Sequence, residues 1–275
     1  MQPVVYLIGS LRNPEVSKVA KALRKQGFEV FDDWHAAGKI ADDSWRDYEQ
    51  AKGHSYSDAL QGHAARHVFH HDLFHLRRSH GCVLVLPAGK SGHLEFGYVV
   101  GLGKPGFILL NGEPERFDAM TQFAYSVQST VQQCVQDLKS FPWPKIPPMP
   151  TMHADEVIPL ALLLEGEGTF SIGKGTTPRL VLQMTDEDVV RWAAKILDSA
   201  VWQTTRTAVY KKIWACGTSG IRAAEWMRVL LPYMKSRRQA QIKKTVATWL
   251  ERRTYNRRDN VVWAKWFGIT EGDLN

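Results

Sequence analysis

A proline-rich stretch at residues 141–150, Phe-Pro-Trp-Pro-Lys-Ile-Pro-Pro-Met-Pro, is the feature that most constrains how this chain can fold. Proline has no backbone N–H and a fixed φ, so this stretch can form neither a helix nor a central strand. It therefore predicts a linker at residues 141–150, with one domain over residues 1–140 and another over residues 151–275. A chain of 275 residues is long enough to give each domain its own core.

Short apolar runs alternate with helical patterns in the first domain. The runs lie at 4–8, 28–31, 82–87 and 107–110, and the helical stretches at 16–26, up to 79, 94–102 and 127–139. This alternation predicts an α/β domain whose parallel sheet is covered by helices on both faces. Ligands of such sheets bind at the carboxyl ends of the strands, which here carry Gly9-Ser10-Leu11-Arg12-Asn13, Asp32-Asp33-Trp34 and the segment 87–98.

Several motifs at these strand ends carry a family resemblance that covers most of residues 3–139. The motifs are Tyr6-x-x-Gly-Ser, Asp-x-Trp, Gly-Lys-Ser-x-x-x-Glu-x-Gly-Tyr and Gly103-Lys104-Pro105. They resemble the nucleoside 2-deoxyribosyltransferase-like family, which implies a flavodoxin-like fold and no cofactor in this domain. The resemblance also implies that Glu95 attacks C1′ of deoxyribose and forms a sugar ester, that Tyr6 orients Glu95, and that Asp72 handles the nucleoside. A carboxylate suits this step because the transition state is oxocarbenium-like.

The same strand ends supply the expected substrate-binding residues, namely Gly9, Ser10, Asn13, Asp33, Trp34 and Ser91. Trp34 can stack on a base, although its ring is equally suited to filling a core. The expected ligand is a deoxynucleoside or nucleotide.

Nine of the ten histidines lie between His35 and His93, and His63, His67, His71 and His75 follow helical i, i+4 spacing. That spacing can bind zinc. No acid or cysteine completes a tight ligand set, so we favour a stripe that binds no metal. A stripe that faces a phosphate or an interface is the alternative.

The second domain begins with an apolar helical segment, Leu160 to Leu164, that ends in Glu165-Gly166-Glu167-Gly168. Acids at a helix C-terminus are repelled by the negative end of the helix dipole unless a cation lies nearby. The run Leu-Ala-Leu-Leu-Leu-Glu-Gly-Glu-Gly-Thr-Phe resembles the signature helix of the LAGLIDADG homing-endonuclease family. The resemblance implies that Glu167 binds the Mg²⁺ that cuts double-stranded DNA. One signature helix per chain implies a homodimer, or a higher homo-oligomer, that brings two Glu167 carboxylates together.

Alternating and periodic stretches after the signature helix predict two hairpins and two helices. The hairpins span 169–184 and 202–216, and the helices span 185–197 and 221–231. With the signature helix, this gives an α+β domain of order αββαββα. The expected DNA-binding side chains are Arg179, Gln183, Arg206, Lys211, Arg237 and Arg238.

Positive charge is concentrated in the second half of the chain. Residues 1–150 hold 16 Lys and Arg against 15 Asp and Glu, whereas residues 151–275 hold 19 against 13. The excess is greatest between Arg206 and Lys265, with 15 basic residues against three acids. This predicts a phosphate-backbone footprint, and the alternative is a solvated basic helix face.

The three cysteines form no CxxC pair, and the N-terminus has no basic region or cleavage site. We therefore expect a reducing compartment and a soluble, cytoplasmic protein.

Three functions fit these features. The first is an enzyme that binds DNA through its basic domain and makes or breaks N-glycosidic bonds of deoxynucleosides, nucleotides or DNA. The second is a homing-type endonuclease joined to a small-molecule enzyme, each acting alone. The third is a non-cleaving DNA-binding regulator whose N-terminal domain senses a nucleotide. The presence of Glu95 and Tyr6 favours the first two, and Glu167 argues against pure regulation.

Overall fold

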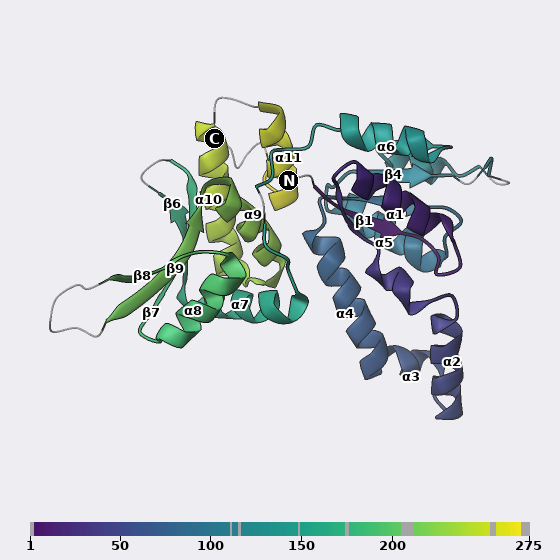
Figure 1. Ribbon diagram of the computed structural model, residues 1–275, viewed down its shortest axis with the longest axis horizontal. Coiled ribbons are helices and arrows are strands. Elements are labelled where there is room, and N and C mark those ends of the chain that lie inside the picture. Colours follow the sequence, from purple (N-terminus) through teal and green to yellow (C-terminus); the bar gives the residue numbers. More distant parts are fainter. Residues whose placement is uncertain are drawn as a thin grey trace. The chain divides into compact units, whose positions relative to one another are not determined.

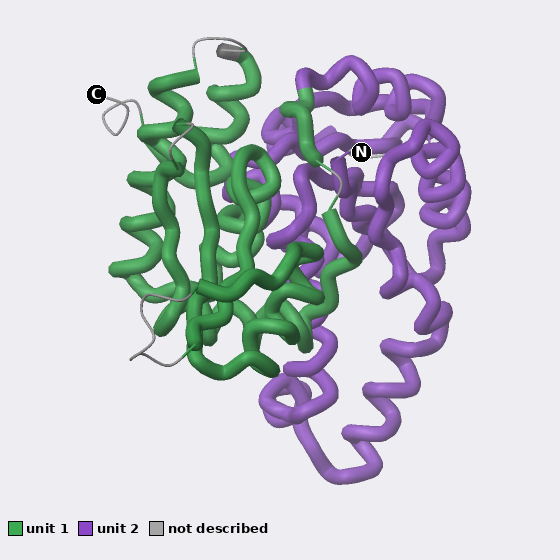
Figure 2. The backbone as a smooth tube through the Cα atoms, turned by 60° about the vertical axis from the view of Figure 1, so that its left-hand side comes forward, with its two compact units in different colours: residues 1, 143–275 green, residues 2–142 purple. Residues whose placement is uncertain are grey.

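The computed structural model describes residues 3–110, 112–114, 117–147, 149–173, 176–204, 212–253 and 257–270. The chain divides into two compact units (Figure 2). The N-terminal unit spans Gln2–Pro142 and the C-terminal unit spans Trp143–Asn275. None of the helices in the described ranges is long and apolar enough to cross a membrane.

The N-terminal unit is built on a five-stranded parallel sheet of order β2-β1-β3-β4-β5. Its strands are β1 (Val4–Ile8), β2 (Glu29–Phe31), β3 (Gly81–Val85), β4 (Gly106–Leu109) and β5 (Ser126–Gln128). Every residue of β1 and β3 is buried, as expected for a sheet covered on both faces. The order is that of the flavodoxin-like fold, so the predicted α/β class is confirmed.

Helices cover the two faces of this sheet (Figure 1). On one face, α1 (Glu15–Lys25) contacts α6 (Val131–Ser140). On the other, the C-terminal part of α4 (His63–Arg78) and α5 (Lys90–Gly101) pack on Tyr6, Ile8, Phe31, Cys82, Leu84 and Ile108. The second face is the one that carries the candidate site, because α4 and α5 bring Asp72 and Glu95 to it.

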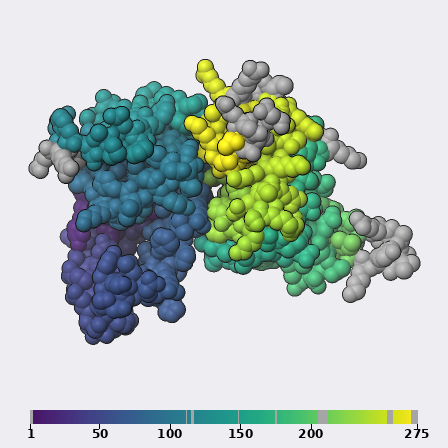
Figure 3. Space-filling model, turned by 180° about the vertical axis from the view of Figure 1, so that it is seen from behind, coloured from purple at the N-terminus to yellow at the C-terminus, as the bar shows by residue number. Residues whose placement is uncertain are grey.

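The structure differs from the sequence-based expectation between β2 and β3. The helical region up to residue 79 is three helices, α2 (Ala41–Ala51), α3 (Tyr56–Leu60) and α4, preceded by the 3₁₀ helix η1 (Asp33–Ala37). The break between α2 and α3 occurs where Gly53 adopts a φ of +77° and where Ser55 caps α3 in a capping box with Asp58. The break between α3 and α4 occurs at Gly62, whose extended backbone forms the N-cap of α4. Helices α2, α3 and the first half of α4 project from the sheet as an arm (Figures 1 and 3).

The end of the N-terminal unit also differs from expectation. Residues 126–128 form the edge strand β5, and the closing helix begins at Val131 rather than at residue 127. Thr130 sets this start, because its hydroxyl accepts the backbone N–H of Gln133. The 3₁₀ helix η2 (Ala119–Phe123) precedes β5.

The C-terminal unit has the order predicted for it. It runs α7 (Ala154–Glu167), β6 (Gly168–Ile172), β7 (Pro178–Met184), α8 (Glu187–Leu197), β8 (Val201–Thr204), β9 (Ile213–Ser219), α9 (Gly220–Leu230), η3 (Leu231–Tyr233), α10 (Ser236–Arg252) and α11 (Arg257–Phe267). The four strands form an antiparallel sheet of order β6-β7-β9-β8. The predicted α+β class with αββαββα order is therefore confirmed.

Alternation along β7 gives this sheet one buried and one partly exposed face. Leu180 and Leu182 are fully buried, whereas Arg179 and Gln183 are exposed. After α9, helices α10 and α11 close the unit through edge-to-face contacts of Trp263 with Trp249 and Trp266. The tryptophans of α10 and α11 thus pack with one another.

Candidate functional site

Glu95 lies on α5, which follows β3 through a turn over residues 86–89. Gly92, one turn before Glu95, allows α5 to approach the sheet closely: a Cβ there would lie 3.2 Å from Ile8 Cγ2 and from Ala88 Cβ. This close approach leaves the Glu95 side chain partly buried rather than on the outer surface of the helix. The site is next to β1 and β3, where the strand order reverses and where ligands of this fold bind.

Tyr6 and Asp72 come to the same place from two other elements. Tyr6 lies in the central strand β1 and is 1% exposed. Asp72 lies on α4, is partly buried, and has Oδ1 3.4 Å from His71 Nδ1. All three groups act on one another electrostatically, because Glu95 and Asp72 both raise the pKa of Tyr6 and Asp72 raises the pKa of Glu95.

The protonation of these groups follows from burial and from their mutual repulsion. Burial first, and then the Asp72 carboxylate, raises the pKa of Glu95 to about 7. Burial also raises the pKa of Asp72, against the opposing hydrogen bond from His71. Burial first, with both carboxylates adding to it, raises the pKa of Tyr6 well above its usual range. Near neutral pH the site therefore holds a phenol that keeps its proton and a carboxyl pair that can exchange one.

Aromatic rings line the side of this cluster. The Phe31 ring lies 5.1 Å from the Tyr6 ring, stacks on His75 at 3.7 Å and lies 5.8 Å from His71, measured between centroids. Trp34 Nε1–H donates to the Leu7 carbonyl at 2.8 Å, which fixes the indole at the carboxyl end of β1. Phe31 and His71 were not predicted as site residues. His71 could have been predicted from its position next to Asp72 in the sequence.

The loop after β1 forms a small pocket with the turn after β3. Its volume is about 240 Å³, and its walls include Ser10, Arg12, Asn13, Pro87 and Gly89. Gly9 is needed in this loop, because a Cβ there would lie 2.7 Å from Val16 Cγ2. The site residues Gly9, Ser10 and Asn13 expected from the sequence thus come together at one strand end.

Asn13 differs in role from the substrate-binding residue expected from the sequence. Its side chain is 3% exposed, and its Nδ2 donates to the carbonyls of Val85 and Pro87 at 3.2 Å. Its Oδ1 accepts the backbone N–H of Glu15 at 3.0 Å. These bonds occupy the carboxamide, so Asn13 joins the two loops of the pocket instead of facing a ligand.

Asp33 and Ser91, also expected to bind substrate, are both exposed. Asp33 is in the first turn of η1, while the preceding Asp32 is paired with Arg24. Ser91 is in the first turn of α5, one turn before Glu95.

The histidine stripe does not form a metal site within the described residues. His63 and His67 are exposed on the projecting half of α4, whereas His75 is buried against Phe31. No group of three His, Cys, Asp or Glu side chains in the described ranges could hold a metal ion.

In the C-terminal unit, a positively charged side chain, that of Arg238, lies at the C-terminus of α7, close to the two acids there. Arg238, on α10, donates from Nε to the Glu165 carbonyl at 2.9 Å and from Nη2 to the Gly166 carbonyl at 3.1 Å. Its guanidinium also lies over the Phe170 ring. Arg238 is only 7% exposed, so the prediction that it binds DNA is wrong: it caps α7 instead.

Glu165 and Glu167 have different surroundings. Glu165 Oε2 accepts the backbone N–H of Lys235 at 2.9 Å, which links α7 to the start of α10. Glu167 is exposed at the last position of α7 and has no hydrogen-bond or ionic partner among the described residues. Leu162, on the outer face of α7, is 62% exposed, and at Gly166 an added Cβ would meet open space.

Three of the predicted DNA-binding side chains are accessible. Arg179 and Gln183 are exposed on one face of β7, and Arg237 is exposed in the first turn of α10. Arg206 and Lys211 lie outside the described residues.

Comparison with known proteins gives weak matches among solved structures. No family model and no curated protein matches the chain. The homing endonuclease I-CvuI in complex with its target, with 2 mM Ca present, is 17% identical over 42% of this chain and 78% of that chain, with a TM-score of 0.29. I-CvuI in complex with the I-CreI target, with 2 mM Mg and the DNA not cleaved, is 16% identical over 40% and 74%, with a TM-score of 0.27. Likeness this weak assigns no residue, so function is inferred from the geometry of the chain itself.

Proposed function

We propose that the N-terminal unit breaks, or transfers, the N-glycosidic bond of deoxynucleosides or deoxynucleotides, with Glu95 as the nucleophile. The observation that supports this most is the meeting of Glu95, Asp72 and Tyr6 from three elements at the switch point of the sheet, with the pKa of Glu95 raised to about 7. Perturbed titratable groups gathered at such a position are typical of an active site.

The chemistry divides into two steps. In the first, a Glu95 oxygen attacks C1′ of the sugar, the C1′–N bond breaks, and its electron pair stays on the base nitrogen, while the Asp72 carboxyl donates a proton to the leaving base. The product is a sugar ester on Glu95. In the second, a second base or water attacks C1′, the ester oxygen leaves as the Glu95 carboxylate, and Asp72 takes up the proton. The Tyr6 phenol keeps its proton and acts electrostatically on Glu95, so we propose that it orients the Glu95 carboxylate by donating a hydrogen bond to it when substrate is bound.

The test is base release and base exchange from deoxynucleosides and their 5′-phosphates. We expect wild-type protein to release base, and to exchange it when a second base is present, and Glu95→Gln to do neither. Glu15→Gln is a suitable control, because Glu15 lies on α1, a helix that follows a strand as α5 does, but pairs with Lys18 at the surface. Equal rates in wild type and Glu95→Gln contradict the proposal.

We propose that the C-terminal unit binds double-stranded DNA. Support comes from the exposed Arg179 and Gln183 on one face of the β-sheet, from Arg237, and from the excess of basic residues in this half. A twisted antiparallel sheet with polar side chains on one face suits the major groove.

Cleavage by this unit would need two chains and Mg²⁺. At the C-terminus of α7, the described residues include one carboxylate without a hydrogen-bond or ionic partner, that of Glu167. Mg²⁺ binds through one or two carboxylates plus waters and phosphate oxygens. Two Glu167 side chains from paired α7 helices fit that requirement, and the Mg²⁺ would stabilise charge at the scissile phosphate.

The test is binding and nicking of a randomised duplex library with and without Mg²⁺. We expect Glu167→Gln to keep binding and to lose nicking. If wild type binds duplex but does not nick it, the unit is a regulator's DNA-binding domain; if wild type does not bind, the proposal for this unit is wrong.

A further inference from the structure

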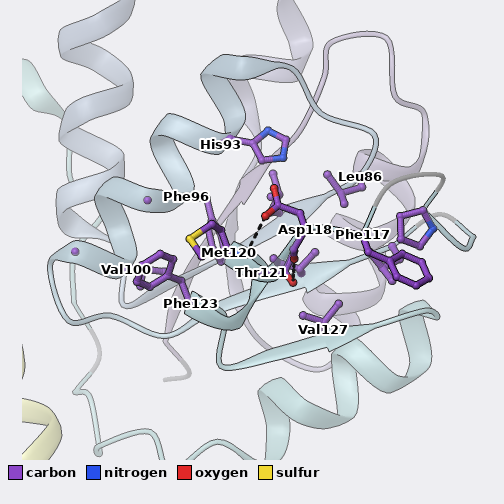
Figure 4. A pocket seen from close by; sticks show the side chains of 16 residues that line it. Leu86, His93, Phe96, Val100, Phe117, Asp118, Met120, Thr121, Phe123 and Val127 are labelled. Carbon is purple, nitrogen blue, oxygen red and sulfur yellow. Dashed lines mark hydrogen bonds between the residues drawn. The ribbon is translucent and has the colours of Figure 1, made fainter.

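A large cavity lies in the N-terminal unit on the face of α5 that is turned away from Glu95. Its volume is about 880 Å³. Figure 4 shows Phe96 and Val100 of α5, Leu86 at the end of β3, and Met120 and Phe123 of η2 around it. Pockets of 300–1,000 Å³ with mostly apolar walls are the usual size for small-molecule sites.

The cavity and the Glu95 cluster are separate sites. The α5 residues that line the cavity are His93, Phe96, Gly97, Val100 and Gly101. With 3.6 residues per turn they share one helix face, and Glu95 falls on the opposite face. Helix α5 therefore lies between the two sites, and a ligand in the cavity would not reach C1′ of a substrate at Glu95.

Two glycines one turn apart form part of the cavity wall. At Gly97 and at Gly101 an added Cβ would meet nothing within 4 Å, so neither glycine is required by packing. By contrast, Gly106 in the same unit is required by packing, because a Cβ there would lie 2.6 Å from the Phe96 ring. A glycine inside a helix destabilises the helix relative to alanine. Here the pair leaves a flat strip of backbone facing the cavity, which suits a planar ring.

Three polar side chains line the cavity, those of His93, Asp118 and Thr121, and each offers a hydrogen-bond acceptor. The Thr121 hydroxyl donates its proton to the Asp118 carbonyl at 2.7 Å, so its oxygen is left to accept. His93 Nδ1 lies 2.9 Å from the Gly89 carbonyl, so this nitrogen carries the proton and Nε2 is left as an acceptor. Asp118 Oδ1 accepts the backbone N–H of Met120 at 2.9 Å, and the other Asp118 oxygen has no partner among the described residues. A ligand must therefore present N–H donors to this edge of the cavity.

The rim of the cavity exposes large apolar side chains to water. Phe117 is 85% exposed, Phe123 67% and Met120 62%. Leaving such side chains uncovered costs free energy roughly in proportion to their area, and a cluster of them marks a binding site more often than chance exposure does.

We propose that this cavity binds a flat heteroaromatic ligand with an exocyclic amino group, such as an adenine-like or cytosine-like base or nucleoside. The ring lies on the Gly97–Gly101 strip between Phe96 and the side chains of η2, and the amino group donates to Asp118 and His93. The site is additional to the Glu95 cluster and does not depend on the chemistry proposed there.

Isothermal titration of the full chain with matched nucleosides tests the proposal. Adenosine and cytidine carry the amino group, and inosine and uridine carry a carbonyl in its place. We expect wild type to bind the amino-bearing member of at least one pair about tenfold more tightly than the other member. One hydrogen bond to a charged group changes the affinity by about that factor. No saturable binding, or equal binding within both pairs, overturns the proposal.

Two variants locate the binding. Gly97→Leu places a side chain in the cavity without a clash, and we expect it to weaken binding of the preferred nucleoside at least tenfold while base release by Glu95 stays within twofold. Asp118→Asn keeps the bond to Met120 N–H but converts the free acceptor to a donor, so we expect it to favour the carbonyl-bearing nucleoside over the amino-bearing one.

Leu94→Ala, at an exposed α5 position outside the cavity, is the matched control. If both cavity variants bind like wild type, the ligand is held elsewhere and the proposal is wrong.

Discussion

Glu95 and Glu167 are both glutamates on helices, but their surroundings are opposite. Glu95 is partly buried beside Asp72 and Tyr6, and its pKa is raised to about 7. Glu167 is exposed at the end of α7 and has no partner among the described residues. The N-terminal unit thus brings its titratable groups together within one chain, whereas the cleavage that we propose for the C-terminal unit would require a second chain and a cation.

The two cases also differ in what holds the acid in place. Glu95 is positioned by the close packing of α5 on the sheet at Gly92. Glu167 is the last residue of α7, and Arg238 from α10 caps the backbone carbonyls of the two residues before it. Disturbing the packing of α5 at Gly92 should therefore lower the rate of base release by the N-terminal unit. Removing the Arg238 cap should instead lower the folding stability of the C-terminal unit.

The largest expected effect is that of Glu95→Gln on base release. The amide cannot form the sugar ester, so we expect the rate to fall by on the order of 10³-fold or more. Nicking of duplex DNA should not change. The measurement is product formation with each substrate; a parallel loss of both activities would show that the two carboxylates do not act separately.

The next effect concerns pairing of α7. Leu162 is 62% exposed on α7, so Leu162→Lys should leave the chain folded while placing two charges against each other in a helix pair. We expect nicking to fall about 100-fold, because losing one apolar contact and adding like-charge repulsion costs a few kcal/mol. Base release per chain should stay constant. Dilution of wild type should mimic the variant for nicking only, and a rate of nicking per chain that is independent of concentration would contradict the two-chain requirement.

Arg237 and Arg238 are adjacent but should respond differently to replacement by alanine. Arg238→Ala removes two part-buried hydrogen bonds to backbone carbonyls and the cation at the end of α7, so we expect a loss of about 2 kcal/mol in the free energy of unfolding. Arg237→Ala should cost less than about 0.5 kcal/mol, since its side chain is exposed. Instead it should weaken duplex binding and reduce the salt slope by about one. Denaturant unfolding and salt-dependent titration measure the two effects; equal stability losses would contradict the capping role.

The smallest expected effect is the pH dependence of base release. The reactive form of the site has Glu95 ionised and a proton on Asp72, so kcat/KM should follow a bell-shaped pH profile. It should fall about tenfold per pH unit above about 7, where the carboxyl pair loses its last proton, and fall again at low pH, where both carboxyls are protonated. Asp72→Asn removes the proton donor and the charge that raises the Glu95 pKa, so the maximum should drop and the fall above about pH 7 should disappear. A wild-type kcat/KM that does not fall above about pH 7 would contradict proton donation by the carboxyl pair.

Much of the fold follows from local pattern, and the exceptions have physical causes. The apolar runs of β1 and β3 are continuous because both faces of the sheet are covered, which made the parallel sheet predictable. Strand β5 was missed because its three residues, Ser126 to Gln128, form an edge strand with no buried residue. The separation of α2 from α3 depends on the backbone conformation at Gly53 and on the cap at Ser55, and that of α3 from α4 on the extended backbone at Gly62, none of which a hydrophobic pattern reveals.

The site was predictable only where a motif concentrated chemistry in one segment. Glu95 and Glu167 stood out from their neighbours in sequence, whereas the bond from Arg238 to Glu165 joins residues 73 positions apart. The burial of Asn13 and the packing of Phe31 on His75 likewise depend on contacts between distant segments. The sequence alone therefore did not determine which polar side chains are free to bind a ligand and which are already engaged in contacts within the protein.

The most direct test of the central claim is to trap the sugar ester on Glu95. Wild-type protein is mixed with a deoxynucleoside, quenched in acid and examined by intact-protein and peptide mass spectrometry, with Glu95→Gln and Glu15→Gln in parallel. The expected result is a single added deoxyribosyl group, mapped to the peptide that contains Glu95, in wild type and Glu15→Gln but not in Glu95→Gln. Base release by wild type with no adduct, or with the adduct on another residue, would contradict the assignment of Glu95 as the nucleophile.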